Sequence, residues 1–564
     1  MTEPRSSATV IGAVLIDALV GRGVRDIVVS PGSRSAPLAL AALNHPHLRV
    51  HVRIDERTAA FLALGLARGS GRPAAVVCSS GTATANYHPA VLEADAAGVP
   101  LVVLTADRPP ELRDAGANQT ITQPGLYGGA VRFFHEVGHD ATAYLRSVVG
   151  QAVGRAQGIG GPPGPVHLNI PLREPLVEAV PVAGEQITDR AAPVPVRKHG
   201  PEVFDMPEVL HTMRRGLVVA GEGTHADEVG AVLQAASNLG LPVLGEPTSG
   251  LRCGTPAVRC GHWLAASKSF TAAQRPDVVI QVGRPVLSRP ISALVASADA
   301  VVTVDPDGRW WDPQRLGGAM VDTTLKALLA ATEGAGVAAE EGWLEAWLDA
   351  DRHASGVLDA HLDGAGKPTE LGLARDLSAA MPDGSQLVVA SSLAIRHLNE
   401  TMTPRAGLRA VGNRGASGID GFVSTAVGAA LGFDGQTAAL AGDLSIIHDM
   451  TGLVIGPDEP VPSLPIVVIN NEGGGIFDLL PYSQHVGQDA FRRVLATPHG
   501  VTLHGLALTT GQFHTDLDDL TELSQTLEDA WSHPVITLIE VQTDTPTETA
   551  RYHTILAAVD DALG

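Results

Sequence analysis

A repeated unit constrains the fold of this chain more than any other feature: a short apolar strand ends in a polar turn, and the turn opens a helix. Alternating strands and helices are typical of a parallel sheet with helices on both faces. In such sheets the polar loops at the carboxyl ends of the strands bind ligands. The first three units run from Asp26 to Ser30 before Pro31-Gly32-Ser33, from Ala74 to Cys78 before Ser79-Ser80-Gly81-Thr82, and from Pro100 to Thr105 before Ala106-Asp107-Arg108.

The unit recurs in three blocks, which predicts an α/β protein of three doubly wound, mainly parallel-sheet domains. The stretch from Gly161 to Pro171 gives the last strand of the first block. We expect this block to end near Pro181, and a Pro- and Val-rich linker at Ala191 to Pro201 follows. We therefore expect domains at 1–185, 200–350 and 365–564. The first and third look alike in plan, as two related domains that face each other across a ligand would. Later strands are expected at Gly216 to Ala220, Leu241 to Leu244, Asp277 to Gly283, Ala300 to Asp305, Gln386 to Ala390, Thr437 to Ala441, Ile466 to Ile469 and Val535 to Val541, with an acidic helix at Glu340 to Leu362.

Length and composition agree with this plan and exclude some classes of protein. A chain of 564 residues is too long for one hydrophobic core. Its 45% hydrophobic and 18% charged residues are typical of buried parallel sheets. A formal net charge of -22 disfavours nucleic acids and anionic membranes as partners. Without a signal-like N-terminus, a run of about 20 apolar residues or a disulfide framework, we expect a cytoplasmic protein.

Two neighbouring motifs near the C-terminal end predict a metal site. Gly442-Asp443-Leu444-Ser445 follows one strand and Asn470-Asn471-Glu472-Gly473-Gly474 follows the next. Neighbouring parallel strands lie about 4.8 Å apart, so Asp443 and Asn471 can reach one ion. Oxygen ligands and flanking glycines suit magnesium, or manganese, bound to a diphosphate, with the Gly473 carbonyl as a third ligand. Alternatively, Asp443 caps a helix and Asn471 fills a turn, but the glycines favour the metal.

Charged residues also interrupt an apolar strand-to-helix junction at Arg53-Ile54-Asp55-Glu56-Arg57. An acidic residue in the first turn of a helix is favourable with the helix dipole, which explains Glu56 without any ligand. That explanation fails only if a cofactor ring needs this carboxylate.

The middle block offers two further patterns. Gly221-Glu222-Gly223-Thr224-His225-Ala226 follows a strand, and Glu246 follows the next, which approximates a dinucleotide fingerprint for NAD. The same glycines can serve tight packing alone. Cys253, Cys260 and His262 are potential zinc ligands, but they lack the usual close cysteine pair.

Together, the Gly-Asp and Asn-Asn motifs and the upstream Glu56 resemble those of thiamine-diphosphate enzymes. Within that class the chain resembles the menaquinone-pathway family of 2-succinyl-5-enolpyruvyl-6-hydroxy-3-cyclohexene-1-carboxylate synthases. Leu444, where the wider class usually has glycine, fits this family. The similarity covers both outer domains and is weaker in the middle one. The motifs that carry it are Ser30-Pro31-Gly32-Ser33-Arg34-Ser35, Asp55-Glu56-Arg57, Ser80-Gly81-Thr82-Ala83, Gly116-Ala117-Asn118-Gln119, Asn413 to Gly421, Gly442 to Ser445 and Asn470 to Pro481.

The resemblance implies three domains of the thiamine-diphosphate enzyme type: aminopyrimidine-binding, middle and diphosphate-binding. It implies a transferase that uses thiamine diphosphate and Mg²⁺ to decarboxylate 2-oxoglutarate and add the succinyl carbanion equivalent to isochorismate in a 1,4-addition. It also implies a homodimer or a dimer of dimers, with each site at a subunit interface. Two alternatives remain: another thiamine-diphosphate carboligase, such as one that uses pyruvate, and a non-catalytic dinucleotide- or metabolite-binding protein.

Roles for individual residues also follow from the resemblance. Glu56 would hydrogen-bond the aminopyrimidine ring, and Ile419 would hold the cofactor bent beneath it. Arginines would bind the carboxylates of both substrates in bidentate fashion. The expected catalytic residues are Glu56, Arg34, Gln119, Ser392, Arg396 and Arg414. The expected cofactor contacts are Pro31, Glu56, Ser392, Gly418, Ile419, Gly442, Asp443, Leu444, Ser445, Asn471, Gly473, Gly474 and Ile476. The expected substrate contacts are Ser392, Arg396 and Arg414 for the succinyl carboxylate, Ser33, Arg34, Arg108, Gln119 and Arg289 for isochorismate, and Thr82, Asn118 and Phe477.

Overall fold

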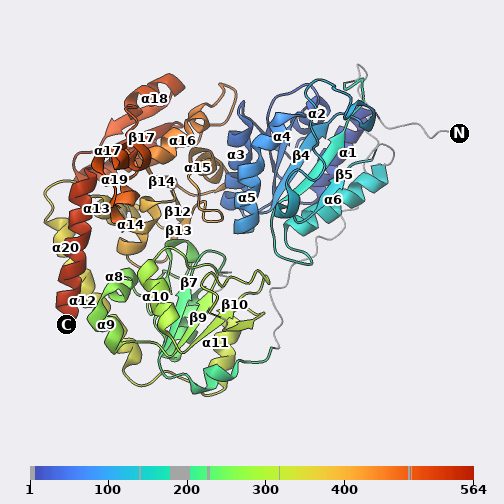
Figure 1. Cartoon of the computed structure of the whole chain (residues 1–564). Coiled ribbons are helices and arrows are strands. Elements are labelled where there is room, and N and C mark those ends of the chain that lie inside the picture. Colours follow the sequence, from blue (N-terminus) through green and yellow to red (C-terminus); the bar gives the residue numbers. More distant parts are fainter. Residues whose placement is uncertain are drawn as a thin grey trace. The chain divides into compact units, whose positions relative to one another are not determined.

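The computed structural model of the chain describes residues 7–138, 142–177, 204–224, 229–316, 318–480, 483 and 485–564. Three sheets follow one another along the sequence, and helices flank them (Figure 1). Within the described residues, every pair of neighbouring strands in the three sheets runs parallel. The α/β, doubly wound fold predicted from the alternating pattern is therefore confirmed.

The first sheet has the strand order β2-β1-β3-β4-β6-β5. Its central strands are buried along their whole length, as expected for a parallel sheet covered on both faces. The strands are β1 (Asp26–Val29), β2 (Arg49–Val52), β3 (Ala74–Cys78), β4 (Leu101–Asp107), β5 (Phe134–Glu136) and β6 (Val166–Pro171). The helices of this block are α1 (Ala8–Gly21), α2 (Ala36–Leu43), α3 (Glu56–Ser70), α4 (Thr82–Asn86), α5 (His88–Ala97) and α6 (Thr142–Ala156).

The third sheet repeats the plan of the first. Its order is β13-β12-β14-β15-β17-β16, so both sheets read 2-1-3-4-6-5 when their own strands are counted in chain order. The expected likeness of the two outer blocks is thus confirmed. The strands are β12 (Ser385–Val389), β13 (Leu408–Val411), β14 (Thr437–Gly442), β15 (Leu464–Asn470), β16 (Phe513–Asp516) and β17 (Ile536–Gln542). The helices are α13 (Glu370–Ala380), α14 (Leu393–Thr401), α15 (Phe422–Gly432), α16 (Asp443–His448), α17 (Gln488–Phe491), α18 (Leu503–Thr510), α19 (Leu523–Trp531) and α20 (Thr545–Leu563).

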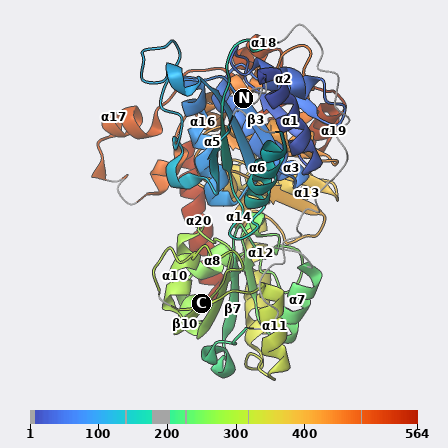
Figure 2. The ribbon, with the colours of Figure 1, turned by 90° about the vertical axis from the view of Figure 1, so that its right-hand side faces the viewer.

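The middle sheet has five strands in the order β11-β10-β9-β7-β8, with apolar cores on both faces. Figure 2 shows β7 with α10 on one side and α11 on the other. Trp343 and Trp347 of α12 pack into the same core as Ile555 of α20, so the last helix of the chain covers this sheet. The strands are β7 (Gly216–Ala220), β8 (Val243–Gly245), β9 (Val278–Val282), β10 (Ala300–Val304) and β11 (Ala319–Val321). The helices are α7 (Val229–Asn238), α8 (Gly261–Ala266), α9 (Lys268–Ala273), α10 (Arg289–Ser297), α11 (Leu325–Gly334) and α12 (Trp343–Asp363).

The described residues divide into two compact units. One unit takes the described residues within 1–197, 413–434 and 446–462, and the other takes those within 198–412, 435–445 and 463–564. Helix α15 joins the first unit because it packs backbone to backbone on α3, where a Cβ on Gly65 would lie 2.2 Å from the Thr425 carbonyl oxygen. A Cβ on Gly428 would likewise lie 2.2 Å from the Leu62 oxygen. Only glycine permits so close a crossing.

The expected boundary near Pro181 and the expected linker at Ala191 to Pro201 lie outside the described residues. The acidic helix expected at 340–362 is α12. Among the described residues, we find no helix with the length and apolar character needed to cross a bilayer.

Candidate active site

The two motifs expected to bind metal meet at the carboxyl edge of the third sheet. Strands β14 and β15 are neighbours in register from Ala439 with Ile466 to Gly442 with Ile469. Asp443 and Asn471 therefore follow adjacent strand ends, and the Gly473 backbone N–H donates to Asp443 Oδ2 at 2.9 Å. Asn471 Oδ1 is buried and accepts no hydrogen bond from any residue that the structure describes. A buried acceptor without a donor is costly, and a bound cation would satisfy it.

The electrostatics of Asp443 also suit a cation. Its side chain is buried, and burial raises its pKa. Hydrogen bonds from His499 Nε2 at 3.1 Å and from the N–H groups of Leu444 and Gly473 offset only part of that rise. A buried carboxylate is stabilised by positive charge, which a divalent metal would supply.

Glycines shape the loop around this carboxylate. Gly473 has a φ of +149°, and a Cβ there would lie 2.1 Å from the Ala496 carbonyl oxygen. The same oxygen accepts from the Gly474 N–H at 2.7 Å. By contrast, a Cβ on Gly442 would meet no atom within 4 Å, so protein packing does not explain this glycine, and the open space suits a ligand. The cradle fits a metal diphosphate.

Behind the cradle lies a buried polar network that sequence reasoning missed. Asn471 Nδ2 donates to Glu370 Oε1 at 2.9 Å, and His397 lies between Glu370 and Glu400 at 2.8 and 3.3 Å. Burial lowers the pKa of His397, but its hydrogen bonds to the two carboxylates outweigh burial and raise the pKa to about 10. His262 Nε2 lies 3.6 Å from Glu400 Oε1, and His262 bonds the hydroxyl groups of Ser288 and Tyr552 at 3.0 and 2.8 Å, so it extends the network into the middle block. The available signal in the sequence was the presence of Glu370 in α13 and of His397 and Glu400 in α14.

The other expected residues of this unit lie on the loops and helix starts nearby. Ser392 has a φ of +70°, which is strained for a side chain other than glycine, and its carbonyl oxygen accepts from Arg396 Nη1 at 2.6 Å. Its neighbour Leu393 approaches the metal loop, since a Cβ on Gly475 would lie 3.3 Å from Leu393 Cδ1. Leu444 and Ser445 lie in the first turn of α16, and Ile476 and Phe477 in a short turn at Gly475–Leu479.

In the other unit, the structure distinguishes two adjacent carboxylates at the start of α3. Asp55 caps the helix, accepting from the N–H groups of Arg57 and Thr58 at 2.9 and 3.4 Å. Glu56 is the first helical residue and is half-buried. Burial raises the pKa of the Cys78 thiol at the end of β3, and the negative charge of Glu56 contributes to the rise. The capping role of Asp55 leaves Glu56 available for another contact.

Two of the residues expected to bind isochorismate, Arg108 and Gln119, hydrogen-bond Ser80. Arg108 Nη1 donates to Ser80 Oγ at 2.6 Å, and Gln119 Nε2 donates to the Ser80 carbonyl at 3.0 Å. Arg34 is buried, and burial and the positive charge of Arg108 lower its pKa. Its Nε is buried and has no partner among the described residues, although Nη1 bonds the Leu172 carbonyl at 3.0 Å. Two close guanidinium groups suit an anionic ligand. Pro31, Ser33 and Asn118 lie exposed on the adjoining loops of this unit, and Thr82 lies exposed at the start of α4.

The loop that carries Arg414 and Ile419 is held by a carboxylate that we did not predict. Glu93 is buried and accepts from the backbone N–H groups of Gly415 and Ala416, each at 2.6 Å. Arg414 is buried, whereas Gly418 and Ile419 are half-exposed. A Cβ on Gly418 would lie 2.3 Å from Asp420 Oδ2, the end of a side chain that can move aside.

The patterns of the middle block have structural explanations. A Cβ on Gly221 would lie 2.1 Å from the backbone of Arg284, and one on Gly223 would lie 2.4 Å from the Trp311 ring, so these glycines serve packing. Glu246 Oε1 accepts from the Leu287 N–H at 2.7 Å. Residues 225 and 226 of the motif lie outside the described part of the chain. Arg289 begins α10, directly after the capping Ser288.

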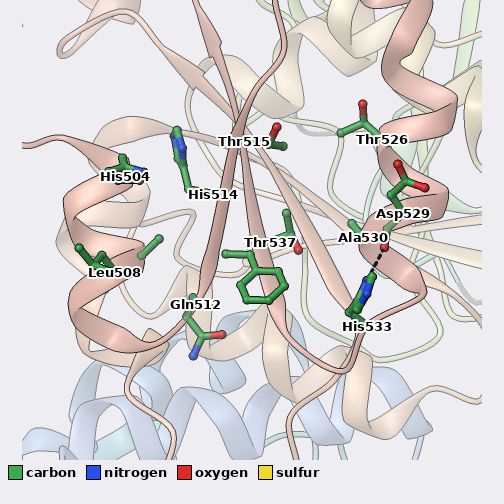
Figure 3. A pocket seen from close by; sticks show the side chains of 12 residues that line it. His504, Leu508, Gln512, His514, Thr515, Thr526, Asp529, Ala530, His533 and Thr537 are labelled. Atoms are coloured by element: carbon green, nitrogen blue, oxygen red, sulfur yellow. Dashed lines mark hydrogen bonds between the residues drawn. The ribbon is translucent and has the colours of Figure 1, made fainter.

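A cavity of about 420 Å³ in the second unit contains none of the expected site residues (Figure 3). It lies at the edge strand β16, between α18 and α19, and its lining includes His504, Phe513, His514 and His533. His514 bonds Glu540 at 2.7 Å, and Glu540 accepts from Asn470 Nδ2 at 2.6 Å, beside the metal loop.

Comparisons with known proteins agree with these features. A family model described as the N-terminal TPP binding domain of thiamine pyrophosphate enzymes matches residues 9–126, and a second, described as the middle domain of thiamine pyrophosphate, matches residues 201–389. A 2-succinyl-5-enolpyruvyl-6-hydroxy-3-cyclohexene-1-carboxylate synthase of Thermobifida fusca is 44% identical over 95% of this chain and 96% of its own length. Synthases of the same name from Saccharopolyspora erythraea, 40% identical over 99% of both chains, and from Bacillus velezensis, 35% identical over 96% of both, are also similar.

Proposed function

This chain belongs to the family of thiamine-diphosphate-dependent 2-succinyl-5-enolpyruvyl-6-hydroxy-3-cyclohexene-1-carboxylate synthases, and we propose on that premise that it decarboxylates 2-oxoglutarate and adds the remaining four-carbon unit to isochorismate. The observation that carries the proposal is the cradle at the ends of β14 and β15, where Asp443, the free oxygen of Asn471 and a glycine loop converge. Thiamine diphosphate, when bound there, supplies the carbon nucleophile.

Three ligands of this chain would hold the metal: the Asp443 carboxylate, the Asn471 amide oxygen and the Gly473 carbonyl. Gly442, Leu444, Ser445, Gly474 and Ile476 would surround the diphosphate. We propose that residues 365–564 bind the diphosphate, that residues 1–185 bind the aminopyrimidine through Glu56, and that residues 200–350 form the middle domain.

Different arginines would bind the carboxylates of the two substrates. Both are dicarboxylates, and guanidinium groups pair with carboxylates in bidentate fashion. Arg396 and Arg414, with Ser392 and Phe477, would bind the succinyl end, while Arg34, Arg108 and Gln119 would face isochorismate. The unpaired Nε of Arg34 supports its role, because a substrate carboxylate would satisfy it. Arg289 is the remaining candidate for isochorismate.

We further propose that the protein is a homodimer or a dimer of dimers in which each active site combines two subunits. The residues expected at the cofactor ring and those expected at the diphosphate belong to different units of the chain, which is compatible with sharing between copies. Light scattering of the purified protein tests the oligomeric state. Cys78, Cys253 and Cys260 are free, as in the reducing cytoplasm, where we place the protein.

Carbon dioxide release distinguishes the proposed reaction from that of a related carboligase. Purified protein with thiamine diphosphate and Mg²⁺ should release carbon dioxide from 2-oxoglutarate, faster when isochorismate is present, and should leave pyruvate largely untouched. Release from pyruvate at a comparable rate, or no dependence on isochorismate, would contradict the proposal.

The adjacent carboxylates Glu56 and Asp55 provide a matched test of the ring contact. Glu56→Gln should lower turnover by about 10² to 10⁴, as loss of a positioned acid-base group does, and leave stability nearly unchanged. Asp55→Ala should instead cost about 1 kcal/mol of stability, because it removes the helix cap. Normal turnover in Glu56→Gln would remove this carboxylate from the mechanism.

A further inference from the structure

The orientation of the Asn471 amide decides whether this residue can bind a metal. An asparagine side chain presents an oxygen on one side and an NH₂ group on the other, and only the oxygen is a ligand. The two differ little in shape, so hydrogen-bond partners must select one orientation. In the structure, Nδ2 faces Glu370 at 2.9 Å, and Oδ1 is buried with no donor among the described residues.

We propose that Glu370 is a positioning residue that turns the Asn471 oxygen toward the metal. An ionised carboxylate only accepts hydrogen bonds, so a group 2.9 Å from Glu370 Oε1 must donate. The opposite orientation of the amide would bring two oxygens together in a buried site. This inference rests on the proposed metal diphosphate site.

The surroundings of Glu370 hold its carboxylate in place. It is 2% exposed and is the first residue of α13. The Thr543 hydroxyl donates to Oε1 at 2.9 Å and His397 Nε2 bonds Oε2 at 2.8 Å, so both oxygens have fixed partners. The backbone N–H of Glu370 donates to Glu548 at 3.2 Å. Outer partners of this kind commonly change metal affinity by about 10- to 100-fold when they are altered.

Exchanging the amide of residue 471 with the carboxylate of residue 370 tests this inference, because the expected change in metal affinity is opposite to the usual one. Asn471→Asp adds a carboxylate, which normally strengthens binding of a hard cation. Here its second oxygen would face Glu370, so we expect Mn²⁺ affinity in the presence of thiamine diphosphate to fall about tenfold or more. In the double variant Asn471→Asp with Glu370→Gln, the new amide can donate to the new carboxylate, and affinity should return to within about threefold of the unaltered protein.

Electron paramagnetic resonance of Mn²⁺ measures these affinities without relying on turnover, and circular dichroism checks the fold. Tighter or equal Mn²⁺ binding by Asn471→Asp, or a double variant that binds no better than Asn471→Asp, would overturn the inference. A residue that only stabilised the fold would give additive losses rather than recovery.

A second pair of variants decides the matter if Asn471→Asp does not fold. Glu370→Met removes the acceptor and should weaken Mn²⁺ binding about tenfold, whereas Thr543→Val removes another donor to the same oxygen and should have little effect. Equal effects of the two variants would count against the inference. If the unaltered protein binds no Mn²⁺ with thiamine diphosphate, the proposed function itself fails, which is a distinct outcome.

Discussion

The crossing of α3 and α15 gives a prediction with a magnitude that follows from the structure. Substituting Gly65→Ala places a Cβ 2.2 Å from the Thr425 oxygen and 2.9 Å from the Ala429 nitrogen. Side-chain Cβ atoms essentially never approach closer than 3.0 Å, so the two helices would have to separate by about 1 Å. Both obstructing atoms are backbone, and no rotamer change can relieve the contact.

Two opposing contributions determine how Gly65→Ala changes the free energy of unfolding: overpacking and helix propensity. Overpacking a close interface costs about 1 to 3 kcal/mol, and a contact between backbones should reach the upper end. Alanine is favoured over glycine in a helix interior by about 1 kcal/mol. Gly356→Ala isolates that second term, because Gly356 lies exposed inside α12 and an added Cβ meets no atom within 4 Å. The two variants should therefore differ by about 3 kcal/mol.

Urea unfolding, followed by circular dichroism, measures this difference. Gly356→Ala should raise the free energy of unfolding of its unit, and Gly65→Ala should lower that of the other unit. Since α3 begins at Glu56 and Ile419 lies just before α15, Gly65→Ala should also weaken thiamine diphosphate binding in calorimetric titration. Equal stabilisation by both substitutions would refute the close crossing of the two helices.

Three further predictions concern the site itself. The pKa of His397 is raised from 6.5 to about 10, so its stabilising charge is fully present below about pH 6.5 and is lost as pH rises toward 10. The free energy of unfolding should therefore fall between these two pH values. In urea titrations at each pH, His397→Gln should reduce this dependence of the unfolding free energy on pH. Gly473→Ala would drive a Cβ into the Ala496 oxygen at 2.1 Å and should weaken Mn²⁺ binding by tenfold or more in paramagnetic resonance, while Gly487→Ala, in open space, should not. Arg414→Lys keeps the charge but loses the bidentate fork, so the KM for 2-oxoglutarate should rise about 10- to 100-fold with little change for isochorismate, as steady-state kinetics would show.

The strands that could be predicted are those that stand out in the sequence as short runs of apolar residues. Central strands of a parallel sheet are buried on both faces and read as apolar runs, as in β4 and β15, whose residues are all buried. Five of the six strands at sheet edges were not predicted: β2, β5, β11, β13 and β16. They are short and partly exposed, so their residues carry little apolar pattern, and pairing with a neighbour rather than local sequence creates them.

The candidate site likewise contains residues with a local sequence signal and residues whose role depends on distant partners. Asp443, Asn471 and the glycines around them could be predicted because metal chemistry limits the residue types and the strand ends fix their spacing. Glu370, His397 and Glu93 could not, because each acts on a partner far away in the chain, and a single charged residue in a helix does not reveal what it contacts.

By itself, the sequence determined the alternation of strands and helices, the loops that carry the candidate site residues, and the chemistry that these residue types can perform. These properties depend on neighbours in the chain. Only the tertiary structure decided that α15 packs on α3 and which side of the Asn471 amide is free. Those outcomes depend on distances and hydrogen bonds between residues that the chain brings together only by folding.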